Sequence, residues 1–137
     1  MSERIIHARS DIMFKKLFAD ENDKTNLKLL LSAILRDVPK DEFEDIVFKE
    51  TILPSDEKEK KICVLNLLVS TKSGMRINIE IQVVGGHVFI ARMVCYNAKL
   101  IVNQLPSGGD YKDLKRSVSI FIVDFNTIDE VSLFSFI

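Results

Sequence analysis

The chain has 137 residues, 47% of them hydrophobic, and a formal net charge of −1 at pH 7. This length supports one domain with a core of its own, and the near-neutral charge argues against a strong non-specific binder of polyanions. Cys63 and Cys95 lie in apolar runs without a C-x-x-C motif, which argues against a structural zinc site. No apolar run approaches the ~20 residues of a membrane span and no signal peptide precedes the domain, so we expect a cytoplasmic protein.

Two helices are predicted before Pro39. A short helix begins at Asp11, a residue type that caps helices, and runs to Phe18 with Lys15 upon it. A longer helix begins at Asn22 or Asp23 and ends before Pro39. Its evidence is a set of apolar residues at helical spacing: Leu27, Leu30, Leu31, Ile34 and Leu35.

Three stretches of strand follow. Residues 46–52 are β-prone, and Pro54 ends them. Residues 62–69 are nearly all apolar apart from Asn66, which predicts a central strand buried on both faces. Residues 75–83 alternate between apolar and polar side chains, which predicts a half-buried strand with one polar face. That polar face carries Arg76, Asn78, Glu80 and Gln82.

The last predicted elements are a helix over residues 87–105 and a buried strand over residues 117–125. In the helix, one stripe is apolar and is expected to face the core: Ile90, Val94, Ala98 and Ile101. A second stripe is polar: Arg92, Tyr96, Lys99 and Asn103. The apolar segment 131–137 is expected to pack on the domain or on another copy of the chain. This order of elements predicts an α/β domain, a mixed sheet with helices packed on it.

The length of one loop predicts which residues face each other. A three-residue turn, Lys72-Ser73-Gly74, with Gly74 in the left-handed conformation, would pair Thr71 with Met75. In the same register Asn66 lies opposite Glu80, with their Cβ atoms ~5 Å apart on one face. A change of one residue in the loop would break this pairing.

Several of these residues suit the chemistry of a metal or phosphate site. Glu80 can bind a divalent cation through oxygen, although a Glu on a solvated strand face is the common alternative. Asn66 would cost ~1–3 kcal/mol if buried without a partner, so a backbone group, Glu80, Gln82 or a bound ion must satisfy it. Gln82 can position a water or a phosphate by hydrogen bonds.

The helices offer further candidates, each with a structural alternative. Arg92, Tyr96 and Lys99 can contact phosphate from the later helix, or form the ordinary polar side of an amphipathic helix. Asp11 and Lys15 can supply a ligand and a positive charge, or a helix cap and a solvated lysine.

Three stretches together resemble a known family: residues 11–18, 77–83 and 119–125. They are similar to PD-(D/E)xK nucleases of the transposase type, the recombination-promoting nuclease branch of bacterial proteins. The resemblance spans about residues 8–128. It implies a restriction-endonuclease-like core in the order α-β-β-β-α-β, with a mixed four-stranded sheet flanked by helices. The chain reads as a single domain over residues 1–137 that lacks the C-terminal helical portion of similar proteins.

The resemblance also implies a function, which is DNA cleavage by a Mg²⁺-dependent or Mn²⁺-dependent endonuclease. Glu80 and Gln82 match the family's catalytic pair, and Asn66 stands at the metal-ligand position where the superfamily has Asp. Glu50 or Asp11 could act as a substitute ligand. Binding of DNA would fall to Arg92, Tyr96, Lys99 and Lys15. The alternative is a catalytically inactive relative that binds DNA or a protein partner through the same cleft, and by analogy either form could be a homodimer.

Overall fold

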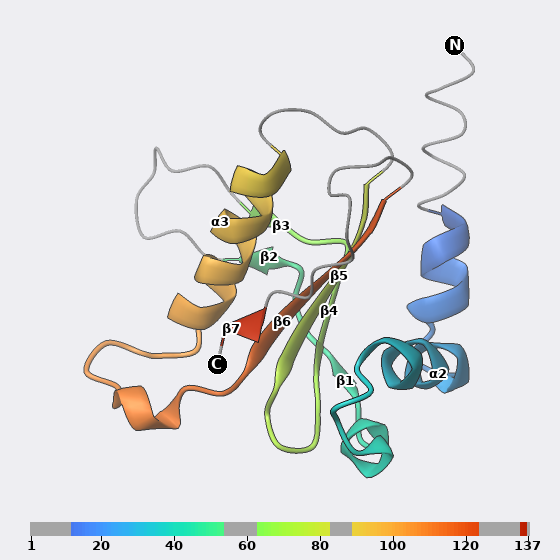
Figure 1. Ribbon diagram of the computed structural model, residues 1–137, viewed down its shortest axis with the longest axis horizontal. Helices are drawn as coiled ribbons and strands as arrows, with labels where there is room; N and C mark the ends of the chain where they lie inside the picture. Colours follow the sequence, from blue (N-terminus) through green and yellow to red (C-terminus); the bar gives the residue numbers. More distant parts are fainter. Residues whose placement is uncertain (1–11, 54–62, 83–88, 124–134, 137) are drawn as a thin grey trace.

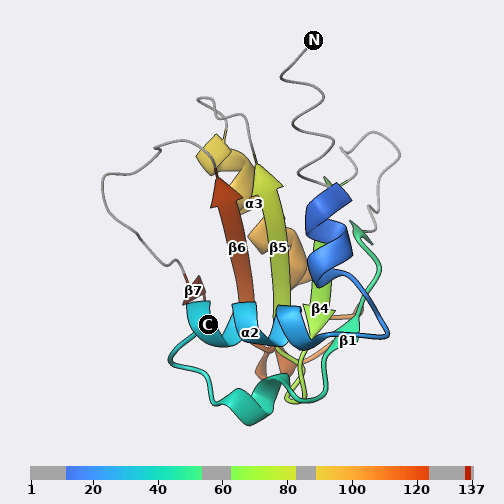
Figure 2. The same ribbon diagram turned by 90° about the vertical axis from the view of Figure 1, so that its right-hand side faces the viewer.

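The computed structural model describes residues 12–53, 63–82, 89–123 and 135–136 of the chain. The domain is α/β, as expected, and is built in layers. Helix α2 (Thr25–Ile34) crosses one face of the sheet, and helix α3 (Phe89–Val102) covers the other face (Figures 1 and 2). The first helix is described over residues 12–18 and lies on the same side of the sheet as α2 (Figure 2). Asp11, its predicted cap, lies outside the described residues.

The main sheet is mixed, with strand order β1-β4-β5-β6-β7. Its central strand β5 runs antiparallel to β4 and parallel to β6. Helix α2, three strands, helix α3 and strand β6 reproduce the expected order α-β-β-β-α-β, and β7 adds a short edge strand from the apolar C-terminal segment. The strands are β1 (Val47–Phe48), β4 (Leu67–Ser70), β5 (Arg76–Gln82), β6 (Ser117–Val123) and β7 (Ser135–Phe136).

A second, two-stranded sheet pairs β2 (Ile52–Leu53) with β3 (Cys63–Val64). The predicted single strand over residues 62–69 is therefore two strands, β3 and β4, interrupted at Leu65 and Asn66. Leu65 still donates its N–H to the carbonyl of Thr51 at 2.8 Å, but Asn66 donates to a side chain. Because the ladder is broken at this point, β3 leaves the main sheet and pairs with β2. Two single-turn 3-10 helices, η1 (Lys40–Phe43) and η2 (Tyr111–Asp113), complete the described elements.

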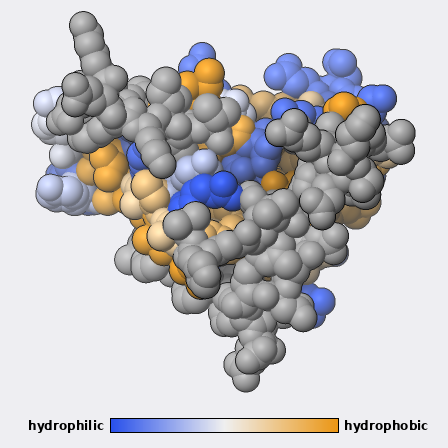
Figure 3. Space-filling model, turned by 90° about the horizontal axis from the view of Figure 1, so that it is seen from above, coloured by the Kyte–Doolittle hydropathy of each residue, from blue (hydrophilic) through white to orange (hydrophobic). Residues whose placement is uncertain are grey.

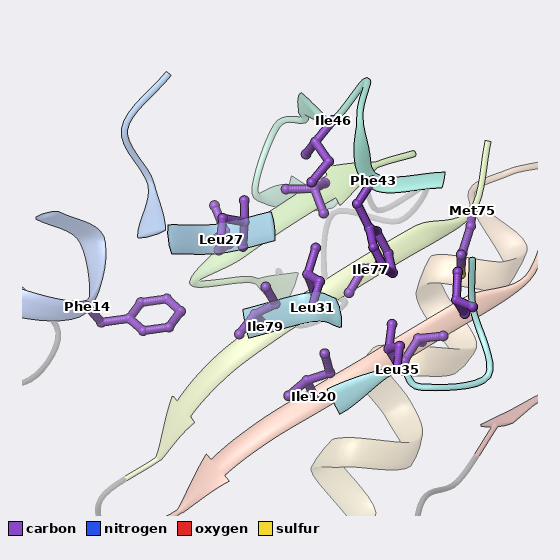
Figure 4. Packing of buried hydrophobic residues seen from close by; sticks show 14 residues of the cluster. Phe14, Leu27, Leu31, Leu35, Phe43, Ile46, Met75, Ile77, Ile79 and Ile120 are labelled. Atoms are coloured by element: carbon purple, nitrogen blue, oxygen red, sulfur yellow. The ribbon is translucent and has the colours of Figure 1, made fainter. Parts of the chain in front are cut away.

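The main core lies between α2 and the sheet. Leu27, Leu31 and Leu35 have no exposed surface, as their helical spacing predicts, and they belong to one cluster with Ile77 and Ile79 of β5 (Figure 4). The helix begins at Thr25, slightly later than predicted, and the Asp23 carboxylate accepts the Thr25 N–H at 3.1 Å just before its first turn.

The β4–β5 hairpin has the predicted register. Leu67 pairs with Ile79 and Ser70 with Arg76, and the Thr71 N–H donates to the Met75 carbonyl at 3.0 Å. Gly74 has a φ of 91°, the left-handed conformation that the three-residue turn requires. The loop length therefore predicts correctly which residues of these two strands face each other.

The predicted orientation of α3 is wrong. Ile90 and Val94 of the apolar stripe are 54% and 55% exposed, whereas Phe89, Asn97 and Leu100 are buried. The reason is the sheet face beneath α3, which is polar at its centre and so accepts the mixed side of the helix. The same packing corrects the prediction for β5, because its polar face is covered rather than solvated. Asn78 is fully buried there, and Glu80 is 8% exposed.

One carboxylate, Glu42, secures the turn of the hairpin. Its Oε1 accepts hydrogen bonds from the hydroxyls of Thr71 and Ser73 and from the Ser73 N–H at 2.9 Å. The hydrogen bond from the Ser73 side chain, followed by that from Thr71, holds the pKa of Glu42 below its usual value. Sequence patterns do not show this contact, because η1 and the turn are far apart in the chain.

We expect Glu42→Gln to destabilise the protein by about 1 kcal/mol at neutral pH, since the clamp is partly exposed. The pKa of Glu42 is lowered on folding, so its contribution is present above the unfolded pKa and is lost as pH falls through the folded pKa. Urea midpoints of parent and variant should therefore differ at pH 7 and converge in acid. Glu44→Gln, at a neighbouring exposed residue, is the control. An equal difference in urea midpoint between parent and Glu42→Gln at both pH values would contradict a stabilising role for the Glu42 carboxylate.

Candidate active site

Asn66 and Glu80 lie together, as the register predicts, and the side chain of each accepts a hydrogen bond from the backbone of the other's strand. The Asn66 N–H donates to Glu80 Oε1 at 2.8 Å, and the Ile81 N–H donates to Asn66 Oδ1 at 3.2 Å. Two side-chain hydrogen bonds thus take the place of backbone ladder bonds where β4 begins. The two hydrogen bonds hold both side chains at the junction of β4 and β5.

The hydrogen bond from Ile81 also fixes which way the Asn66 amide is turned. An N–H donor needs an acceptor, so the carbonyl oxygen must face Ile81 and the NH₂ group occupies the other end of the amide. An aspartate in this place would keep the acceptor and put a second oxygen where Asn66 has its NH₂ group. Asn66 therefore offers the site one neutral oxygen, which already accepts a hydrogen bond.

Glu80 belongs to the face of β5 that α3 covers. Ile77, Ile79 and Ile81 pack with α2, so the alternating residues Asn78 and Glu80 point to the opposite layer. There Glu80 lies beside Phe121 of β6 in the sheet register, and Phe121 meets Phe89 edge to face at 5.7 Å between ring centroids. The aromatic pair ties the first turn of α3 to the strand beside Glu80, which is 8% exposed.

The three helix residues proposed for phosphate contact are partly buried on α3. Tyr96 packs against the smaller apolar cluster that includes Leu65 and Leu68, which flank Asn66 in the chain. Arg92 and Lys99 are of intermediate exposure. Tyr96 therefore lies near the β4 side of the site, and the positively charged residues Arg92 and Lys99 lie on the same helix.

The remaining candidates stand in different positions. The backbone of Gln82 ends β5, paired with Val123, and its side chain lies outside what the structure describes. Glu50 is exposed in the link between β1 and β2. Lys15 is exposed on the first helix, whose Phe14 packs in the α2-side core. Asp11 lies outside the described residues.

A row of buried and half-buried polar side chains on the α3 side of the sheet was not predicted as a unit. The Gln104 amide donates to the Ser117 hydroxyl at 2.7 Å, and the Ser119 hydroxyl donates to Asn97 Oδ1 at 3.2 Å. Asn78 lies beside Ser119 in the parallel register of β5 and β6. We call these five residues the polar seam. Its sequence signals are the alternation of β5 and the serines that open β6, and neither indicates the contacts with Asn97 and Gln104.

A surface hollow of about 340 Å³ lies elsewhere, next to α2 and η1. The Lys24 and Lys28 amines at this hollow donate to the carbonyls of Ile46 and Glu44, at 2.7 and 2.8 Å. These contacts tie α2 to the following segment. The hollow has no part in the arrangement around Glu80.

Seen from the end of the sheet where β5 and β6 terminate, the described surface presents hydrophilic and hydrophobic residues side by side (Figure 3). Within the described residues, no three or more His, Cys, Asp or Glu side chains are grouped closely enough to hold a metal ion. No helix in this part of the chain is long and apolar enough to span a bilayer.

The oxygen atoms beside Glu80 meet only part of what a divalent cation requires. Mg²⁺ is commonly held by one or two carboxylates together with waters and substrate phosphates. Glu80 supplies one carboxylate, whose Oε1 already accepts the Asn66 N–H, and Asn66 supplies a neutral oxygen without charge. These residues therefore fit a divalent cation with the smallest number of carboxylates that such sites have, and we expect weak binding.

The sequence model of a family described as PD-(D/E)XK nuclease family transposase matches residues 8–135. No curated protein and no solved structure matches the chain.

Proposed function

Because the chain belongs to the PD-(D/E)XK nuclease family of transposases, we propose that it is a metal-dependent DNA endonuclease whose activity Asn66 impairs. The observation that carries this proposal is the pairing of Asn66 with Glu80 at the start of β4, beside α3. This hairpin places the buried carboxylate of Glu80 beside a second oxygen ligand, the amide oxygen of Asn66. The family and the geometry together support hydrolysis of a phosphodiester bond.

The roles follow from the chemistry of each side chain. Glu80 would be the main ligand of Mg²⁺ or Mn²⁺, with Asn66 as a weak second ligand. When bound, the cation supplies polarisation of a phosphoryl oxygen and a water of lowered pKa. Gln82 would orient that water or a phosphate oxygen by hydrogen bonds, since an amide cannot take its proton at neutral pH. Asp11 and Glu50 remain the proposed accessory ligands.

Binding of the DNA backbone would come from the helices. Arg92 and Lys99 carry the charges that phosphate contacts require, and Tyr96 can donate its hydroxyl to a phosphate oxygen. Lys15 could contact the substrate from the first helix. We further propose a bacterial, cytoplasmic protein and, by analogy with nucleases that cut both strands, a homodimer.

A second candidate function is favoured by the orientation of the Asn66 amide. Its NH₂ group stands where an aspartate would offer a second, charged oxygen. A site with one carboxylate fewer attracts a dication less strongly, whereas contacts to phosphate from α3 are unaffected. The domain would then bind DNA or a protein partner without cutting.

The test is plasmid nicking by the parent and by Glu80→Gln, with Mg²⁺ and separately with Mn²⁺. The variant keeps the size of the side chain and an acceptor for the Asn66 N–H but removes the charge. We expect slow cleavage by the parent, faster with Mn²⁺, because Mn²⁺ binds a given N/O site more tightly. We expect at least a tenfold loss in the variant.

Gel shift on the same samples separates the two candidates. DNA binding without nicking by either protein would favour the binding module. Full Mg²⁺ activity in the parent would show that Asn66 does not impair the site, and equal nicking by the variant would exclude Glu80 as the ligand.

A further inference from the structure

In the polar seam, the side-chain amide of Asn78 makes no hydrogen bond. Asn78 has no exposed surface, and neither its Oδ1 nor its Nδ2 has a hydrogen-bond partner within the described part of the protein. Its neighbours in the seam are paired, Ser119 with Asn97 and Ser117 with Gln104. Asn78 is therefore the point at which the seam lacks protein partners.

An amide in this state is costly. Leaving both a donor and an acceptor unpaired in the interior shifts the folding equilibrium about tenfold or more toward the unfolded chain, and more than nine in ten buried polar groups in proteins are paired. The position is in the centre of the sheet, between Leu68 of β4 and Ser119 of β6. A small ligand of the interior is the remaining source of partners.

The chemistry of the surroundings selects the ligand. An anion is disfavoured, because Glu80 lies two residues along β5 on the same face, at about 7 Å between Cα atoms. A cation would pair only with Oδ1 and would leave the Nδ2 group unpaired. Water both donates and accepts, and globular proteins hold about one buried water per 27 residues at such groups.

We propose that Asn78 binds internal water beneath α3 and that this water links the polar seam to Glu80. Two hydrogen bonds through one bent water span about 4.5–5 Å between the two polar atoms. One water can therefore join polar side-chain atoms of residues whose Cα atoms are about 7 Å apart on one strand face. Asn78 is then a positioning residue, which holds the Glu80 carboxylate from its buried side while the Asn66 N–H holds it from β4. The water site stands without the proposed nuclease function, and only the importance of positioning Glu80 rests on that function.

The sign of a stability change tests the proposal. Asn78→Leu keeps the approximate shape and removes the amide. With water bound, the variant breaks a satisfied network and should lower the melting temperature by about 3–8 °C. With the amide truly unpaired, the same change should raise the melting temperature, because it removes the unpaired groups. Asn97→Leu is the matched control, since Asn97 has a protein partner and its loss should lower the melting temperature in either case.

A direct readout comes from nuclear magnetic resonance of the whole ¹⁵N- and ¹³C-labelled chain. We expect cross-relaxation from a long-lived water to the Asn78 side-chain NH₂ protons. We also expect Asn78→Leu to change the chemical shift of the Asn66 backbone N–H, which donates to Glu80, and Asn78→Ser to restore it in part. Absence of the water signal in the parent, or a rise in the melting temperature of Asn78→Leu, would overturn the water site. An unchanged Asn66 N–H shift in Asn78→Leu would overturn the link to Glu80. None of these readouts depends on cleavage of DNA.

Discussion

Asn66→Asp should increase the affinity of the protein for Mg²⁺ by about tenfold to a hundredfold. The hydrogen bond from the Ile81 N–H explains why this gain in affinity should need no rearrangement of the backbone. The new carboxylate can keep one oxygen on the Ile81 N–H and turn the other toward the site, with no movement of the hairpin. A second negative charge then stands beside Glu80, which is the pair of charges that a dication favours.

The same substitution should make the metal-free protein less stable. Two neighbouring carboxylates repel each other, and the repulsion is weakly screened here because Glu80 is only 8% exposed. Mg²⁺ should therefore raise the melting temperature of the variant much more than that of the parent, since a ligand stabilises by its occupancy of the native state. Calorimetric titration and thermal unfolding with and without Mg²⁺ measure the two effects.

Two control variants define what the result means. Asn66→Ala removes the acceptor for the Ile81 N–H, so it should lose stability without gaining affinity. Asn66→Asp combined with Glu80→Ala should lose most of the gain. If Asn66→Asp binds Mg²⁺ no better than the parent, position 66 is not the sole obstacle. If it binds well yet does not nick DNA, the obstacle lies after metal binding.

Leu100→Ala should destabilise the protein by about 2–4 kcal/mol, whereas Val94→Ala should change the free energy of unfolding by less than about 0.5 kcal/mol. Both residues lie on α3, but Leu100 is buried in the smaller apolar cluster and Val94 is 55% exposed. The periodicity of the helix predicts Val94 in the core. The pair of variants therefore tests the orientation of α3 directly.

Urea unfolding with equal m-values for parent and variants is the appropriate measurement, since the midpoint then reports stability alone. A large loss in Val94→Ala with little loss in Leu100→Ala would mean that the helix is rotated as its apolar stripe predicts. It would also remove Asn97 from its place beside Ser119 and, with it, the polar seam.

The contrast between β5 and α3 shows what could be predicted from the sequence. The register of the hairpin depends on the turn, which is local, and the glycine at its end is visible in the chain. The facing of Asn66 and Glu80 therefore follows from the length of one loop. The α2 stripe was equally predictable, because an apolar helix face met an apolar sheet face.

The orientation of α3 could not be found in this way. The helix has an apolar arc and a mixed one, and the choice depends on the sheet face that it meets. Asn78, Ser117 and Ser119 make that face polar only after β5 and β6 have been placed side by side. The break at Leu65 and Asn66 was missed for a similar reason, since it is a side chain of the neighbouring strand that takes up the Asn66 N–H. The Glu42 clamp, too, joins segments that only the fold brings together.

The hairpin also determines what the candidate site costs in chain entropy. Asn66 and Glu80 meet when β4 pairs with β5, and the only loop between these two strands is the three-residue turn. Pairing β5 with β6 instead closes a loop that contains all of α3. The entropy lost on closure grows with loop length, so the two central side chains meet through one of the least demanding contacts of the sheet. The more demanding closure is the one that carries Arg92, Tyr96 and Lys99. The oxygen donors of the site and its proposed phosphate contacts are thus assembled by separate parts of the fold.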